Sequence, residues 1–146
     1  MLRSQSLDVD QLREALKAAR RRGVQDSRLE SHAPGLIELL YPARSYPELT
    51  IHHRAMATEN LIRAAIDVLG NEARHLLSVL LCVDPATSHL LLQRRREIAA
   101  QRVGVLPTTW QRGRWERQLL TDLAAKIYRL HYNHADTYIP EPAEHD

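Results

Sequence analysis

Few side chains in this 146-residue sequence could form a catalytic centre. Cys82 and the adjacent pair Ser88 and His89 are of the types that act as nucleophile and base, and they lie near one another in the sequence. A nucleophile of this kind commonly sits on a glycine-flanked turn, and no such turn surrounds these residues. Cys82 is the only cysteine and lies in the apolar run of residues 76–83, so we expect it to be a small buried side chain.

The histidines give little support for a metal site. His52 and His53 are adjacent and would point to different sides of a helix. His131 and His134 are three residues apart and could share a face. A single cysteine excludes an internal disulfide and a thiolate zinc cage, and no glycine-rich phosphate loop occurs. We therefore expect a protein that is not an enzyme and that requires no metal or other cofactor.

Arginine is the chemically distinctive residue of this sequence. The net charge is only +2, but residues 91–117 hold seven arginines against two glutamates, whereas residues 133–146 hold four acidic residues and no lysine or arginine. The arginines of this basic block are Arg94, Arg95, Arg96, Arg102, Arg112, Arg114 and Arg117. A basic block followed by an acidic tail suggests a polyanionic partner for the block. A GC-rich genome would also enrich arginine, and Arg94 to Arg96 could instead form a solvated, partly salt-bridged helix start.

Residues 98–112 fit a helix-turn-helix unit. Such a unit needs a small residue where the two helices cross, a turn residue that tolerates positive φ, and an apolar residue that packs back from the second helix. Ala100, Gly104 and Trp110 occupy these positions, and Val105 would fill the core beneath the turn. Because aromatic burial is the usual outcome, we expect Trp110 and Trp115 to lie in a core or an interface, on different faces.

Residues 94–117 resemble the helix-turn-helix of bacterial DNA-binding regulators. The positions that match are Ala100, Gly104, Val105, Pro107, Thr109 and Arg112. Leu106 stands where the family usually has a capping residue, so Thr108 with Gln111 three residues later would have to cap the second helix. Gly113 falls where the exposed face of that helix would continue, and it predicts a kink or an end.

The resemblance implies a role for each polar residue of this segment. The residues facing the DNA bases would be Thr108, Thr109, Gln111, Arg112 and Arg114. The residues meeting phosphates would be Arg94, Arg95, Arg96 and Arg102. The implied partner is duplex DNA. Because one recognition helix buries little surface, we expect a homodimer whose interface comes from the long final helix or from the N-terminal helices.

A wider stretch, residues 61–130, resembles a helical module found in uncharacterised actinobacterial proteins, some of them associated with signalling or phage defence. This resemblance keeps a second function open, that of a non-enzymatic adaptor that binds a partner protein. The binding surface would then be Trp115 together with the apolar faces of residues 9–22 and 119–130. Fold alone does not separate the two functions.

Scarce glycine, few aromatic residues and the lack of β-branched runs favour an all-α fold, a single compact domain of about five to seven helices. The expected helices span residues 9–22, two short pieces between 27 and 41, then 50–69, 71–83, 90–103 and 109–131. Gly23, Gly70 and Gly104 would end three of them.

We expect an N-terminal helical segment (1–49), a helical core (50–132) and a flexible acidic tail (133–146). The loop of residues 41–49 is the best candidate for a joint between subdomains. No apolar run approaches the roughly 20 residues of a membrane span, and the first residues do not read as a secretory signal. A soluble, cytoplasmic protein without a membrane partner is expected.

Overall fold

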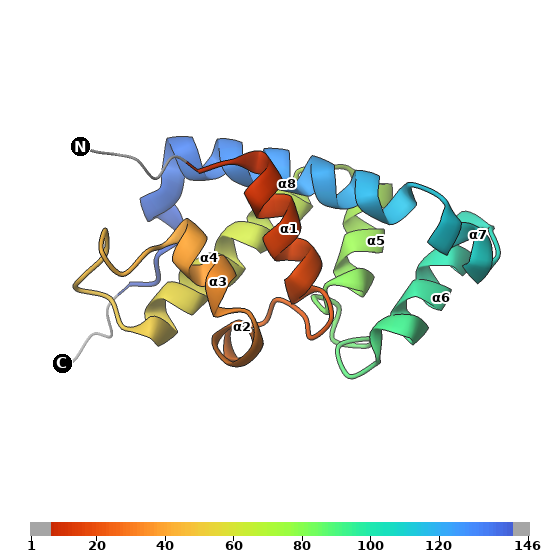
Figure 1. Cartoon of the computed structure of the whole chain (residues 1–146), viewed down its shortest axis with the longest axis horizontal. Coiled ribbons are helices and arrows are strands. Elements are labelled where there is room, and N and C mark those ends of the chain that lie inside the picture. The colour runs from red at the N-terminus through yellow and green to blue at the C-terminus, as the bar shows by residue number, and fades with distance from the viewer. Residues whose placement is uncertain (1–6, 142–146) are drawn as a thin grey trace.

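The computed structural model describes residues 7–141, which form eight α-helices, one 3-10 helix and no strand (Figure 1). The α-helices are α1 (Val9–Ala19), α2 (Asp26–His32), α3 (Pro34–Leu40), α4 (Ile51–Asp67), α5 (Asn71–Leu80), α6 (Leu92–Val103), α7 (Pro107–Arg112) and α8 (Trp115–His134). The 3-10 helix η1 spans Ala135–Tyr138. The predicted all-α fold is confirmed.

The helix ends follow local capping chemistry. Asp8 is the N-cap of α1 and accepts a hydrogen bond from an N–H of the first turn at 2.8 Å, and Thr50 does the same for α4 at 3.0 Å. The three glycines predicted to stop helices all have positive φ: Gly23, Gly70 and Gly104. The turn chemistry of these segments is therefore local, which is why the sequence predicted it.

The helix expected over residues 109–131 is interrupted at Gly113, where the sequence predicted a kink or an end. The chain forms α7 and then α8, with Gly113 extended between them. A Cβ at Gly113 would lie 3.0 Å from Cδ1 of Trp115 and 3.1 Å from the carbonyl oxygen of Thr109. The missing side chain thus leaves room for the Trp115 indole to fold back over the chain.

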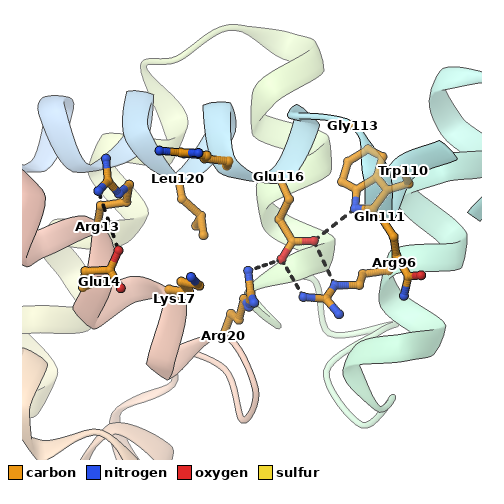
Figure 2. Close-up of a pocket in the computed structure, with 11 residues that line it drawn as sticks. Arg13, Glu14, Lys17, Arg20, Arg96, Trp110, Gln111, Gly113, Glu116 and Leu120 are labelled. Carbon is orange, nitrogen blue, oxygen red and sulfur yellow. Dashed lines mark hydrogen bonds and ion pairs between the residues drawn. The ribbon is translucent and has the colours of Figure 1, made fainter. Parts of the chain in front are cut away.

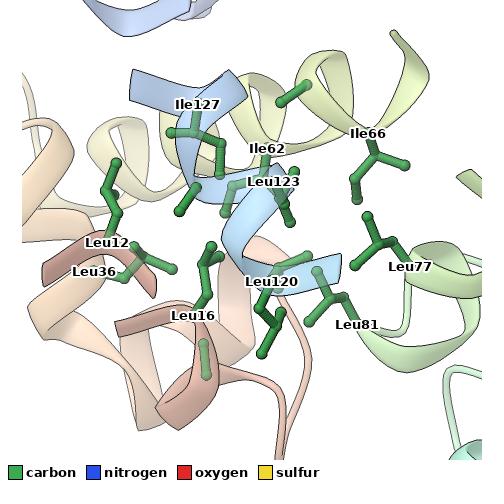
Figure 3. Close-up of a cluster of buried hydrophobic side chains, with 14 of the residues drawn as sticks. Leu12, Leu16, Leu36, Ile62, Ile66, Leu77, Leu81, Leu120, Leu123 and Ile127 are labelled. Carbon is green, nitrogen blue, oxygen red and sulfur yellow. The ribbon is translucent and has the colours of Figure 1, made fainter. Parts of the chain in front are cut away.

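One hydrophobic core joins the N-terminal helices to the rest of the molecule. α1 packs along α8, and α2 and α3 pack against α4. Leu12 and Leu16 of α1 are fully buried beside Leu123 and Ile127 of α8 (Figure 3). Tyr41, at the start of the loop expected to be a joint, is fully buried as well. Residues 7–49 are therefore part of the same packed unit as α4 and α8.

The folded chain continues beyond the point where the acidic tail was expected to begin. α8 extends to His134 and η1 follows it. The carbonyl oxygen of Ala135 accepts a hydrogen bond from the Tyr41 hydroxyl at 2.7 Å, and that of Tyr138 accepts one from the Asn60 side chain at 3.0 Å. Residues 133–141 thus pack on α4 and on the end of α3, and residues 142–146 lie outside the described range.

α8 runs along the length of the molecule, and α6 and α7 lie at the opposite end from α3 (Figure 1). There α6 packs between α5 and α7. The basic segment singled out in the sequence therefore forms one end of the molecule, and it joins the core through the buried residues Ala99, Ala100 and Trp110.

Gly23 lies against the buried residue Cys82, and this contact gives a stability prediction. A Cβ at Gly23 would lie 2.7 Å from Cβ of Cys82. Gly70 has nearly the same φ, +104° against +103°, but nothing within 4 Å of its added Cβ. We expect Gly23→Ala to lower the free energy of unfolding by about 2 kcal/mol more than Gly70→Ala, because only the first substitution overpacks the core. Urea denaturation followed by circular dichroism measures both.

The double variant Gly23→Ala with Cys82→Gly tests the cause. Removing the Cβ of Cys82 takes away the clash and also relieves that residue's own positive φ of 64°. The double variant should then lose less stability than the sum of the two single variants. Additive losses would show that the contact is not responsible.

Candidate nucleic-acid interface

The turn between α6 and α7 has the left-handed glycine that the sequence predicted, but the predicted Thr108 cap is wrong, because α7 has Leu106 as its N-cap and no side-chain cap hydrogen bond. Gly104 ends α6 in the left-handed conformation, with φ 77° and ψ 28°. The N–H of Val105 donates back to the carbonyl of Ala100 at 3.0 Å, and Ala100 is fully buried. Val105 is half-buried against the core. Pro107 then starts α7, whose first turn needs no N–H at that position.

A single side chain holds α7 to the protein. Trp110 is the one buried residue of this helix, and its Nε1 donates to Oε1 of Glu116 at 3.0 Å. Trp115 stacks on Trp110 with ring centroids 6.0 Å apart and planes at 8°, while 40% of Trp115 stays exposed. The prediction that the two rings lie on different faces is wrong, because the break at Gly113 lets Trp115 turn back.

The other side chains of α7 face solvent. The exposed residues of this helix and the turn after it are Thr108, Thr109, Gln111, Arg112 and Arg114. Residues 98–115 contain no carboxylate, and in the described part of the chain neither Arg112 nor Arg114 forms an ion pair. We call residues 107–114 the α7 corner; apart from Trp110 its residues form an exposed, positively charged surface.

Arg95 does not belong to this surface, and its assignment to phosphate contact is wrong. Its side chain is 1% exposed. The guanidinium donates to the carbonyl oxygens of Leu90, Arg20 and Arg21 at 2.8 to 2.9 Å, and also to that of Leu80. These carbonyls include the ends of α1 and α5, where helices carry unsatisfied acceptors and partial negative charge. Arg95 is thus a buried cap shared by two helices.

Arg96 is also committed inside the protein. Its Nε and Nη2 donate to the two carboxylate oxygens of Glu116 at 2.9 and 3.0 Å, and Arg20 donates to the same carboxylate (Figure 2). With Trp110, these residues form the Glu116 cluster, which ties together α6, α7, α8 and the end of α1. Its geometry assigns Arg96 a positioning role in place of the expected phosphate contact.

Electrostatics keep the carboxylate of this cluster ionised. Burial by itself raises the pKa of Glu116, but hydrogen bonds from Arg96 and Trp110 and the charge of Arg20 outweigh it, so the pKa is lowered. Glu116 is 8% exposed. The cluster therefore depends on one buried carboxylate, and both oxygens of this carboxylate accept hydrogen bonds from the donors of the cluster.

Arg94 and Arg102 remain on the surface of α6. Arg94 lies 3.1 Å from Glu97, and Arg102 lies 3.7 Å from Glu72; all four side chains are more than a third exposed. Such exposed pairs contribute little and exchange readily for other anions. Of the four arginines assigned to phosphates, these two are placed where they can make that contact.

The residues considered for nucleophilic chemistry do not come together. Cys82 is fully buried, as expected. The hydroxyl of Ser88 donates to a backbone carbonyl at 3.2 Å, and His89 is exposed without a side-chain partner among residues 7–141.

The two histidines considered for a metal site, His131 and His134, lie in different surroundings. Nε2 of His131 lies 2.6 Å from the carbonyl oxygen of Leu40, and burial lowers the pKa of His131, whereas His134 is exposed. His52 pairs instead with Glu30 at 2.8 Å, a hydrogen bond that raises the pKa of His52. Over the described range, no three His, Cys, Asp or Glu side chains gather in a way that could hold a metal ion.

The apolar faces proposed for an adaptor are not available for a partner. The face of α1 and that of α8 are buried against each other, including Leu16 and Leu120 (Figure 3). The same packing removes them as a dimer interface. Of the expected adaptor surface, only Trp115 stays accessible.

Sequence reasoning missed Glu116 and Arg20 as members of a site. The available signal was periodicity, because Glu116 lies three and four residues before the buried Leu119 and Leu120 and so shares their helix face.

No helix of the described chain has the length and hydropathy needed to cross a membrane. Comparison with family models, curated proteins and solved structures finds no significant match, so the site is interpreted from its residues alone.

Proposed function

We propose that the protein is a DNA-binding regulator that places α7 in the major groove of duplex DNA. The observation that carries this proposal is the α7 corner: a surface helix with one buried residue, Trp110, while its polar side chains face outward beside two arginines without ion pairs. α7 lies at one end of the molecule, opposite α3 (Figure 1).

The proposed contacts follow from the donor chemistry of each side chain. Arg112 can pair with guanine O6 and N7, and Gln111 with adenine. Arg114 with Arg94 and Arg102 would meet phosphates and supply salt-dependent affinity. Arg95 and Arg96 would act only by holding α6 in place.

The short recognition helix argues for two copies on the DNA. Six residues of α-helix are about 9 Å long, enough to reach only a few base pairs. Paired half-sites are the common remedy, so we expect a homodimer on its operator. Light scattering with and without a selected DNA fragment would measure the stoichiometry.

Fluorescence anisotropy with a pool of genomic fragments over a salt series tests the proposal. The wild type should bind a subset of fragments tightly, with affinity that falls steeply with salt. Arg112→Ala should lose discrimination by about 1 to 3 kcal/mol. Arg102→Ala should weaken all fragments alike and reduce the salt slope by about one.

Arg129→Ala is the matched control, because Arg129 is exposed near the far end of α8. It should change neither selectivity nor salt slope. Weak, unselective binding by the wild type at physiological salt would contradict the proposal.

That outcome would favour the second candidate, an adaptor in a bacterial signalling or defence system. The observation in its favour is exposed apolar surface next to α7, with Trp115 40% and Leu106 69% exposed. Trp115→Ala should then abolish capture of the partner, while Arg112→Ala should not.

A further inference from the structure

A cleft of about 430 Å³ opens between α1 and α7, with α8 along its floor (Figure 2). Pockets that bind small molecules commonly begin at about 300 Å³. The walls come from separate parts of the chain, with Lys17 on α1, Gln111 on α7 and Arg117 on α8. Trp110, Gln111 and Gly113 of the α7 corner contribute to the lining of the cleft.

Positive charge dominates the lining. Five basic and two acidic side chains line the cleft, an excess of three positive charges. The basic ones are Arg13, Lys17, Arg20, Arg96 and Arg117. Of the two acidic residues, Glu116 already accepts hydrogen bonds within the Glu116 cluster. Glu14 is mostly exposed and lies 3.6 Å from Arg13. Glu116 offsets part of the charge of Arg20 and Arg96, and Arg13 also lies 3.5 Å from Asp10, so among residues 7–141 the lining cations without a carboxylate partner are Lys17 and Arg117.

Several N–H donors of these cations are uncommitted. The side chains of Lys17 and Arg117 have no hydrogen bond or ion pair within residues 7–141. Arg20 donates to Glu116 only through Nη1, and Arg96 leaves its Nη1 without an acceptor. None of these nitrogens is among the buried polar atoms without a partner, so they are open to solvent. Donors from α1, α6 and α8 thus converge on one space.

We propose that this cleft binds a small phosphate-bearing anion. Guanidinium groups form two parallel hydrogen bonds with phosphate, and an excess of three charges suits a multiply charged ligand better than a single carboxylate. The indole of Trp110 and the side chain of Leu120 also line the space, which allows an organic group to be attached to the phosphate. The proposal does not depend on DNA binding by α7.

Calorimetric titration of the full chain with inorganic phosphate, pyrophosphate and adenosine triphosphate, at constant ionic strength and without DNA, tests the proposal. We expect saturable binding of at least one probe at one site per chain. If pyrophosphate and the nucleotide bind alike, the phosphates alone are recognised; if the nucleotide binds more tightly, the attached group contributes.

Two double variants decide whether the cleft is the site. Lys17→Gln with Arg117→Gln should weaken binding more than about tenfold, since two charge-assisted contacts are lost. Lys126→Gln with Arg129→Gln removes the same two residue types from α8 outside the cleft and should weaken binding less than about twofold. Neither pair belongs to the Glu116 cluster, and thermal melting without ligand verifies folding. A smaller difference between the two variants, or no saturable binding by the wild type, would overturn the proposal.

Discussion

Arg95→Met is expected to lower the free energy of unfolding by about 4 kcal/mol. The methionine fills much of the same space but donates no hydrogen bond, so four buried or half-buried backbone carbonyls lose their donor at once. The substitution also removes a positive charge from the ends of α1 and α5, where the helix dipoles favour it. Burial lowers the pKa of Arg95, which reflects the desolvation that these carbonyls offset.

Its neighbour Arg94 provides the control, because its side chain is 57% exposed and pairs only with Glu97. Arg94→Met should cost less than about 0.5 kcal/mol in the same urea denaturation experiment. Arg95→Lys should fall in between, since an ammonium keeps the charge but cannot reach four carbonyls as the guanidinium fork does. Equal stability of the Arg94 and Arg95 methionine variants would show that the carbonyl contacts contribute nothing.

Prediction from the sequence succeeded where structure is decided locally. Glycines that adopt positive φ act through neighbouring residues, so Gly23, Gly70 and Gly104 marked the turns that follow α1, α4 and α6. The turn at Gly104 was predictable for the same reason. The exposure of Thr108 and Arg112 also follows from local pattern, because Trp110 alone supplies an apolar side to α7.

The prediction failed for charged residues whose partners are distant in sequence. Arg95 and Arg96 look alike in an arginine run, yet their acceptors lie on α1, α5 and α8. Helical periodicity could have predicted that Arg95 faces the interior, since Arg95 precedes the buried Ala99 by one turn. Periodicity places a residue on the buried face of a helix. Only the tertiary structure shows that backbone carbonyls and a carboxylate lie next to that residue and accept its hydrogen bonds.

Glu116→Gln is expected to lower the free energy of unfolding at pH 7 by about 3 kcal/mol, because it leaves two half-buried arginines without their counter-charge. The amide also presents N–H groups where Arg96 and Arg20 donate, so at least one of these hydrogen bonds is lost. Glu97→Gln, which breaks the exposed pair with Arg94, should cost less than about 0.5 kcal/mol.

The difference between the wild type and Glu116→Gln should shrink in acid. Because the pKa of Glu116 is lower in the folded protein than in the unfolded chain, its stabilisation is complete above the unfolded value of about 4.5 and is lost as pH falls through the folded value. The glutamine variant lacks this titration, so urea denaturation at pH 7, 5, 4 and 3 should show the two curves converging below about pH 4.5. The Glu97→Gln curve should stay close to that of the wild type throughout. A gap between wild type and Glu116→Gln that stays constant to pH 3 would mean that the carboxylate does not stabilise the fold through its charge, and the junction of α1, α6, α7 and α8 would then depend on packing around Trp110 alone.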